Sequence, residues 1–154
     1  MATGKFTLKT NLAGLLEESG ELTYPSILKP IVSDIGKVYT VSLMKTGCED
    51  CEKYHPIRER VATKMERKFN GGVQFDDITV SQNESDLGKK LFLATAYPTV
   101  MTLIVVPVAE GVRYVGETSR LTESISERAL VSNIDYAFFL AQRAEKKVRS
   151  WSSL

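Results

Sequence analysis

The chain has 154 residues, of which 43% are apolar and 25% are charged, values close to the average for globular proteins. This length fits one domain, and the composition excludes a chain that is mainly disordered. Twenty Lys and Arg residues against nineteen Asp and Glu residues leave a formal net charge of +1, so the sequence offers no overall field that would attract nucleic acid or an anionic membrane.

No segment predicts a membrane span or a targeting peptide. The longest apolar run, Val100 to Val106 with Thr102 inside it, is far shorter than the ~20 residues that a bilayer requires. The amino terminus lacks an apolar central region and carries Glu17, Glu18 and Glu21, whereas targeting peptides avoid acids. We therefore expect a cytoplasmic protein that makes no membrane contact.

The first elements are predicted with different clarity. Asn11 to Ser19 favours a short helix, and Tyr24 to Ile35 favours another despite Pro25 and Pro30. From Val38 to Met44 the sequence VYTVSLM is rich in β-branched and aromatic residues and is followed by a Thr-Gly pair. This composition predicts a buried strand.

A helix and a second strand follow. From Glu49 to about Phe69 apolar residues recur every three or four positions, and charged residues occupy the other side of the predicted helix. Gly71 and Gly72 end this helix, and Gln74 to Val80 predicts the next strand. A strand, a helix and a strand in this order form a crossover unit, so the two strands are expected to be parallel.

The second half of the chain predicts a helix, a hairpin and a last helix. Residues 83–85 are capping residues, and apolar residues at helical spacing follow them. Thr99 to Val106 predicts a third strand, and Val112 to Val115 a short strand that pairs with it antiparallel. Ser119 or Thr122 is expected to cap the last helix. Its predicted apolar stripe consists of Ile125, Val131, Ile134, Phe138, Ala141 and Val148.

The two cysteines form the motif Cys48-Glu49-Asp50-Cys51 where the first predicted strand gives way to a helix. Unpaired backbone N–H groups and the helix dipole stabilise a thiolate at such a position, and a helix N-terminus can lower the pKa of a cysteine from about 8.5 to roughly 3.5–7.5. We therefore predict that Cys48 is a nucleophile. Cys51 lies one turn later and is placed to resolve a disulfide that Cys48 forms with another protein.

A metal site is the alternative interpretation of this motif. Cys48, Cys51 and His55 are zinc ligand types that lie close together on one helix, but a structural zinc site uses four ligands, and the chain has no other Cys or His. A redox disulfide is therefore favoured over a zinc site and over a pair of inert thiols.

Several positions together resemble the thioredoxin family. The family's active-site helix resembles CEDCEKYHPIRERVA, in which Pro56 stands five residues after the second cysteine. Its next strand, second helix and cis-proline turn resemble ITVSQNESDLGKKLFLATAYPTVMTLIV, which places the cis proline at Pro98, and its closing hairpin resembles GVRYVGETS. The resemblance covers about residues 37–140, and residues 1–36 match only loosely.

The resemblance implies one α/β domain over residues 1–154 with a thioredoxin fold. This fold has a central mixed sheet of four to five strands flanked by helices, here with residues 1–36 as an N-terminal extension and first βα element and with a long C-terminal helix. The family's geometry places Pro98 beside the cysteines and lets the backbone of Tyr97 bind an extended substrate peptide. Gly47, Glu49 and Asp50 belong to the same expected binding surface.

The resemblance also implies an activity. A thioredoxin-like protein is a thiol–disulfide oxidoreductase, a protein disulfide reductase that takes part in electron transport through its own Cys48–Cys51 disulfide and needs no metal or organic cofactor. Its expected partners are disulfide-containing proteins and a reductase or small thiol as electron donor. A binding or adaptor subunit of a larger complex, with the same fold and little redox turnover, is the alternative.

The sequence departs from the family's Trp-Cys-Gly-Pro-Cys motif, because Gly47 replaces the tryptophan and two acids replace the central Gly-Pro. Negative charge beside Cys48 disfavours the thiolate, so we predict a reducing couple nearer the about −270 mV of thioredoxin than the about −120 mV of DsbA. The missing tryptophan, the missing loop proline and the missing buried aspartate favour the adaptor alternative.

The family's buried aspartate is replaced by Ser42, and its accompanying lysine by Asp77. Asp77 and His55 are the candidates to accept a proton from Cys51. The alternatives are a solvated strand acid for Asp77 and a surface or packed histidine for His55.

Overall fold

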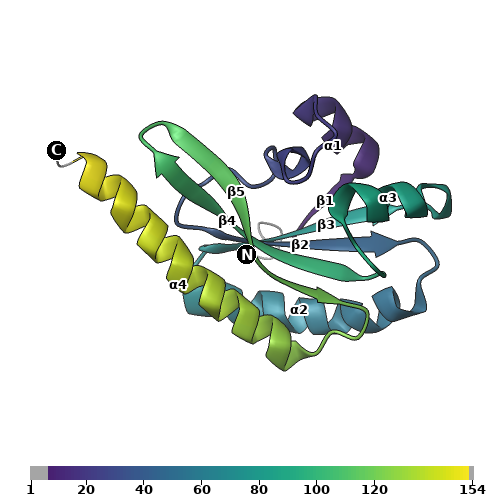
Figure 1. The fold of residues 1–154 in the computed structure, drawn as a ribbon. Coiled ribbons are helices and arrows are strands. Elements are labelled where there is room, and N and C mark those ends of the chain that lie inside the picture. The colour runs from purple at the N-terminus through teal and green to yellow at the C-terminus, as the bar shows by residue number, and fades with distance from the viewer. Residues whose placement is uncertain (1–6, 153–154) are drawn as a thin grey trace.

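Five strands form one mixed sheet at the centre of the computed structural model, which describes residues 7–152 (Figure 1). The strand order is β1-β3-β2-β4-β5. Strands β1, β2 and β3 are parallel to one another. Strand β4 runs antiparallel to its neighbour β2, and β5 runs antiparallel to β4. The strands are β1 (Thr7–Asn11), β2 (Val38–Lys45), β3 (Val73–Val80), β4 (Thr99–Ala109) and β5 (Val112–Thr122).

Helices cover both faces of this sheet (Figure 1). One face packs against α1 (Leu12–Ser19), the short 3₁₀ helix η1 (Ser26–Leu28) and α3 (Ser85–Phe92). The other face packs against α2 (Glu49–Phe69) and the long C-terminal α4 (Glu127–Ser152). A further 3₁₀ turn, η2 (Gln82–Glu84), leads from β3 into α3. The predicted thioredoxin-like architecture, with a mixed sheet of five strands, is thereby confirmed.

The burial of two central strands explains why the elements in the middle of the chain could be predicted from the sequence. Strands β2 and β3 lie inside the sheet with helices on both faces, so most of their side chains are buried. They pair in parallel from Val38 opposite Val73 to Lys45 opposite Val80, as the crossover prediction requires.

Within residues 7–152 no helix has both the length and the apolar character needed to cross a membrane.

The hairpin and the start of the last helix differ from the prediction. Strand β5 continues to Thr122, so Ser119 and Thr122 are strand residues, and the prediction that one of them caps the last helix was wrong. Instead the Ser126 hydroxyl accepts a hydrogen bond from the Ala129 N–H at 3.1 Å. Strand β5 is an edge strand, and its residues after Val115 are mostly polar, so the sequence pattern predicted a strand that is too short. The residues of the last helix that are buried most completely are Leu130, Ile134, Ala137 and Ala141.

The N-terminal segment contains one predicted helix and lacks another. Helix α1 forms as expected, with the Asn11 side chain accepting the Gly14 N–H at 2.7 Å. The helix predicted from Tyr24 to Ile35 was wrong, because only η1 forms there. Pro30 has no amide hydrogen, so a helix that passed through this position would lose a backbone hydrogen bond.

Candidate active site

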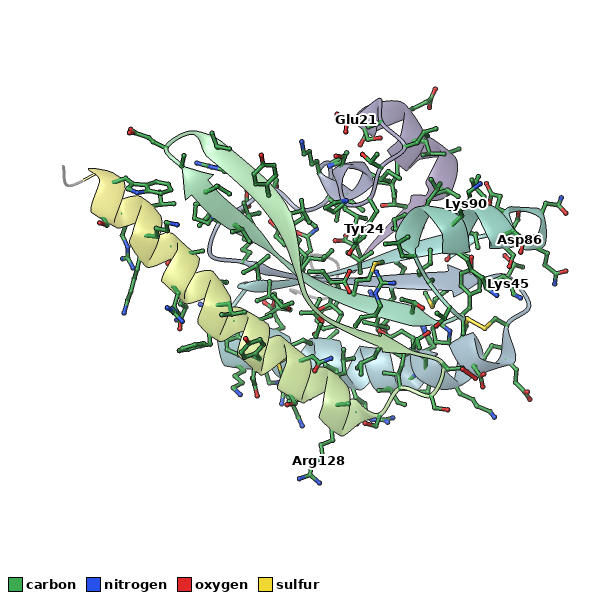
Figure 2. All side chains as sticks on the ribbon, in the orientation of Figure 1. Glu21, Tyr24, Lys45, Asp86, Lys90 and Arg128 are labelled. Carbon is green, nitrogen blue, oxygen red and sulfur yellow. A yellow bond between two sulfur atoms is a disulfide. The ribbon has the colours of Figure 1, made fainter. Side chains whose placement is uncertain are left out.

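The cysteine motif lies at the end of the sheet where β2 leads into α2 (Figure 2). The Thr46 N–H donates to the Val80 carbonyl at 3.0 Å, which fixes the end of β2 against β3. Gly47 then turns the chain with a φ of +75°, a conformation that glycine adopts without strain. This turn delivers Cys48 to the first position before the helix.

Cys48 is the N-cap residue of α2, and its sulfur accepts the Cys51 N–H at 3.1 Å. The two Cα atoms are 5.2 Å apart and the sulfurs form a disulfide. Cys48 is half-buried, whereas Cys51 is only 7% exposed and packs into the core. The structure therefore brings the two sulfurs together, with Cys48 as the more accessible residue of the pair.

Acidic residues surround this helix start. Glu49, Asp50 and Glu52 occupy the first turn of α2, where negative charge stabilises the helix through its dipole. Asp50 also lines a groove of about 280 Å³ between α2 and the segment that follows β5. The groove has an apolar floor of Tyr54, Ile57 and Ile125. Its rim carries Lys53 and Glu123 besides Asp50.

The loop before β4 lies at the same end of the sheet as the cysteines. Because β2 and β4 are antiparallel and Leu43 pairs with Thr99, the start of β4 lies beside the end of β2. The peptide bond between Tyr97 and Pro98 is cis, as the resemblance implied. Tyr97 packs in the same core cluster as Cys51, and its hydroxyl donates to the Ser85 carbonyl at 2.6 Å.

A cluster of buried polar side chains lies between α2 and the sheet. The Ser42 and Tyr54 hydroxyls are 2.7 Å apart, and the Arg58 Nε donates to the Asp77 carboxylate at 2.8 Å. All four side chains are nearly inaccessible to solvent. Burial raises the pKa of Tyr54 far above its usual value, so its hydroxyl keeps its proton. Asp77 is thus a buried acid whose charge is balanced by Arg58, and the alternative of a solvated strand acid was wrong.

Two members of this cluster were missed from the sequence. Tyr54 is one of the apolar residues that recur between Glu49 and Phe69, so the sequence pattern indicated only a core role for it, and Arg58 was not singled out at all. Arg58 stands four residues after Tyr54 and three before Val61, so it falls on the buried side of α2. A charged residue inside an apolar stripe, together with an acid on the adjacent strand, was the available signal. His55, by contrast, lies exposed on α2.

The described residues show no metal centre. Within residues 7–152, no group of three or more His, Cys, Asp or Glu side chains is arranged to hold a metal ion. Cys48 and Cys51 are joined to each other, and their sulfurs are used by the disulfide.

Fold and site together define a protein with the thioredoxin fold and a CxxC disulfide. No family model and no curated protein matches the sequence. Among solved structures, a thioredoxin from Nicotiana alata superposes with a TM-score of 0.56 and 18% identity, over 86% of this chain and 93% of that one. The thioredoxin of Fasciola hepatica gives 0.50 and 18%, over 85% and 97%. A chain of the complex between ferredoxin:thioredoxin reductase and thioredoxin f2 gives 0.52 and 12%, over 87% and 96%. The resemblance seen in the sequence is confirmed at the level of the fold.

Proposed function

We propose that the protein is a thiol–disulfide oxidoreductase that reduces disulfides in other proteins. One observation carries the proposal: the more accessible sulfur of the pair, that of Cys48, caps the N-terminus of α2, and Cys51 lies directly behind it. A thiolate at this position is stabilised by the helix dipole and by the Cys51 N–H.

The reaction moves two electrons from the protein's dithiol to a substrate disulfide. The Cys48 thiolate attacks one substrate sulfur, the substrate S–S bond breaks, and the departing sulfur takes up a proton as a thiol. Cys51 then loses its proton and attacks the Cys48 sulfur in the mixed disulfide. The second substrate thiol is released, and the Cys48–Cys51 disulfide remains.

The substrate is an extended peptide held beside the cysteines. The backbone at Tyr97 and the cis Pro98 form one side of its binding surface, and Gly47, Glu49 and Asp50 form the other. The groove between α2 and the segment after β5 receives a substrate side chain. Its rim has two acids and one lysine, so a substrate with a basic residue near its cysteine fits best.

The oxidised protein is returned to the dithiol by a reductase or a small thiol. Its structural neighbour from the complex with ferredoxin:thioredoxin reductase supports a reductase as donor. Because a dithiol that works as a reductant must be kept reduced, we assign the protein to the cytoplasm. The acids beside Cys48 favour a potential near the about −270 mV of thioredoxin, which a redox titration measures directly.

The first experiment tests the activity itself. Insulin and dithiothreitol are incubated with the protein, and the turbidity of the reduced insulin chains is followed beside a Cys48→Ser control. We expect turbidity with the native protein and none above background with the variant. No activity, or activity that survives the substitution, contradicts the proposal and favours an adaptor role.

A second experiment identifies the proton acceptor for Cys51. Asp77→Asn and His55→Gln are compared with the native protein as reductase rate against pH. The group that takes the proton is expected to change the shape of the profile when it is replaced. Unchanged profiles in both variants remove both candidates.

A further inference from the structure

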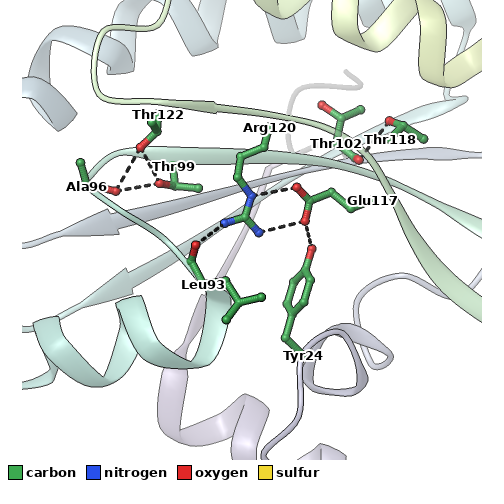
Figure 3. Close-up of polar contacts among 9 residues, drawn as sticks. All are labelled: Tyr24, Leu93, Ala96, Thr99, Thr102, Glu117, Thr118, Arg120 and Thr122. Atoms are coloured by element: carbon green, nitrogen blue, oxygen red, sulfur yellow. Dashed lines mark hydrogen bonds and ion pairs between the residues drawn. The ribbon is translucent and has the colours of Figure 1, made fainter.

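The loop from Leu93 to Pro98 is tied to the end of β5 (Figure 3). The Arg120 Nη1 donates to the Leu93 carbonyl at 2.8 Å, and the Glu123 N–H donates to the Pro98 carbonyl at 2.8 Å. Between these points the Thr99 hydroxyl donates to the Ala96 carbonyl at 2.7 Å. The loop that precedes the cis proline is thus fixed at both ends and in the middle.

Arg120 fixes the loop at the end of a helix. Leu93 is the C-cap of α3 and has a left-handed conformation with a φ of 56°. The last carbonyls of a helix have no partner within it and carry the negative end of the helix dipole. A guanidinium that donates to the Leu93 carbonyl satisfies one such acceptor and places a positive charge where the dipole favours it.

Arg120 is itself held by a second layer of contacts. Its Nε and Nη2 donate to the two carboxylate oxygens of Glu117, at 2.8 and 2.9 Å. Glu117 also accepts a hydrogen bond from the Tyr24 hydroxyl. Burial, with Glu117 as an added cause, raises the pKa of Tyr24 far above its usual value, so the phenol remains a donor. We name the series Tyr24, Glu117 and Arg120 the latch.

An irregularity in β5 makes the latch geometrically feasible. In a regular strand, residues three apart point to opposite faces. Here Glu117 pairs with Leu103 and Arg120 with Met101, so one extra residue lies in β5 between the two pairs. This bulge turns Glu117 and Arg120 to the same face of the sheet, where their side chains meet.

The latch also ties in the N-terminal segment. The Tyr24 ring packs edge-on against Phe92, the last residue of α3, with ring centroids 6.4 Å apart. The Arg120 guanidinium lies over the same tyrosine ring, 5.7 Å from its centroid. Tyr24 precedes η1, whose Ile27 and Leu28 are fully buried. The latch is therefore anchored in the core through a segment far from the cysteines in sequence.

We propose that Tyr24, Glu117 and Arg120 are positioning residues that hold the Leu93–Pro98 loop ready for a substrate peptide. This inference rests on the proposed function, in which the loop binds that peptide. A loop already fixed in its bound conformation loses less entropy on binding, so the latch strengthens binding of protein substrates without touching the sulfur chemistry. The N-terminal segment thereby acquires a role in substrate binding.

The test separates binding from chemistry. The protein is reduced, freed of reductant and mixed with insulin or with a small aromatic disulfide, 5,5′-dithiobis(2-nitrobenzoate), and its oxidation is followed by acid quenching and thiol alkylation. We expect Arg120→Gln to raise the half-saturating insulin concentration about tenfold, as the loss of one charged hydrogen bond predicts. Tyr24→Phe, which removes only a hydroxyl, is expected to raise it about threefold.

Matched controls define a positioning effect. The rate with the small disulfide and the redox potential are expected to be unchanged in both variants, because neither depends on the loop. Arg113→Gln removes an exposed arginine from the other end of β5 and is expected to behave as the native protein. Arg120→Lys, which keeps the charge and loses the forked geometry, is expected to give an intermediate value.

The outcomes distinguish the latch from the activity. An unchanged half-saturating concentration, or an equal loss with both substrates and a shifted potential, overturns the latch. A native protein that reduces neither disulfide overturns the proposed function instead. In that case, hydrogen exchange at residues 94–97 still decides whether the latch holds the loop. Faster exchange in Arg120→Gln and Tyr24→Phe than in Arg113→Gln supports the latch, and equal exchange refutes it.

Discussion

Asp76 and Asp77 are consecutive residues of β3, yet the sheet places them in two different environments. Asp77 shares a face with Phe75, packs against α2, and forms an ion pair with the buried Arg58. Asp76 points to the opposite face, where the Gln74 amide donates to both of its carboxylate oxygens. Both acids are almost completely buried. One therefore has a full opposite charge beside it, and the other has only a neutral amide.

The two faces of the sheet therefore place a buried carboxyl group in different electrostatic environments. Burial raises the pKa of Asp76 to about 7, an effect that the Gln74 hydrogen bond and Arg58 only partly offset and that the charge of Asp77 increases. The face of α2 and α4 thus stores a charged pair, whereas the face of α1, η1 and α3 holds an acid that is half protonated near neutral pH.

The largest expected effect comes from breaking the charged pair. Asp77→Asn removes the buried carboxylate of the pair and leaves Arg58 with only the exposed Glu59, 2.7 Å from its Nη1, which is expected to lower the free energy of unfolding by about 3–5 kcal/mol. Asp135→Asn is the matched control, because Asp135 forms an exposed ion pair with Lys68 at 2.7 Å. Urea unfolding of the oxidised proteins measures both, and the control is expected to lose less than about 1 kcal/mol. Equal losses would show that Glu59 alone balances the charge of Arg58.

The burial of Asp76 on the face of α1, η1 and α3 leads us to expect that the stability of the protein depends on pH. In the unfolded chain the pKa of Asp76 is near the ordinary value of 3.8, whereas in the folded protein its pKa is about 7 and it holds the proton up to that pH. Stability is therefore expected to fall as the pH rises from about 4 to about 7. Asp76→Asn removes this slope and is expected to stabilise the protein at pH 8 by up to about 4 kcal/mol.

Unfolding free energies at pH 4, 6 and 8 check this expectation. Asp86→Asn, which replaces an exposed acid on α3, serves as the control and is expected to retain the slope of the native protein. If Asp76→Asn has the same slope as the native protein, the protonation of Asp76 does not govern stability on this face. If it is destabilised at pH 8, the carboxylate has a partner that outweighs its burial.

Much of the fold follows from local patterns. Strand β2, helix α2 and strand β3 were predicted nearly to their observed bounds, because a buried parallel strand is continuously apolar and an amphipathic helix repeats every three or four residues. Strand β5 was predicted too short, since an edge strand with polar residues lacks that signal. The segment around η1 was predicted as a helix because its apolar residues recur at helical spacing. A series of turns can bury apolar residues at the same spacing, so this pattern does not distinguish the two.

Part of the candidate site could be predicted from the sequence and part could not. The cysteines, Gly47 and Pro98 lie in or next to recognisable motifs, so their place at one end of the sheet follows from the order of the elements. The sequence does not tell which of two neighbouring acids faces α2, because a strand shifted by one residue exchanges its faces. The Tyr24–Glu117 contact joins residues 93 positions apart and depends on a bulge, for which the sequence has no local pattern.

The smallest expected effect concerns the neutral pair beside the charged one. Ser42 and Tyr54 share one hydrogen bond of 2.7 Å in the space between β2 and α2. Because both partners are neutral, Ser42→Ala and Tyr54→Phe are each expected to cost about 1 kcal/mol. The double variant leaves no unpaired hydroxyl, so it is expected to be less destabilised than the two single losses added together, with a coupling of about 0.5–1 kcal/mol. A coupling of zero in urea unfolding would mean that each hydroxyl has a second partner, and a coupling as large as the Asp77→Asn loss would mean that the whole cluster with Arg58 acts as one unit.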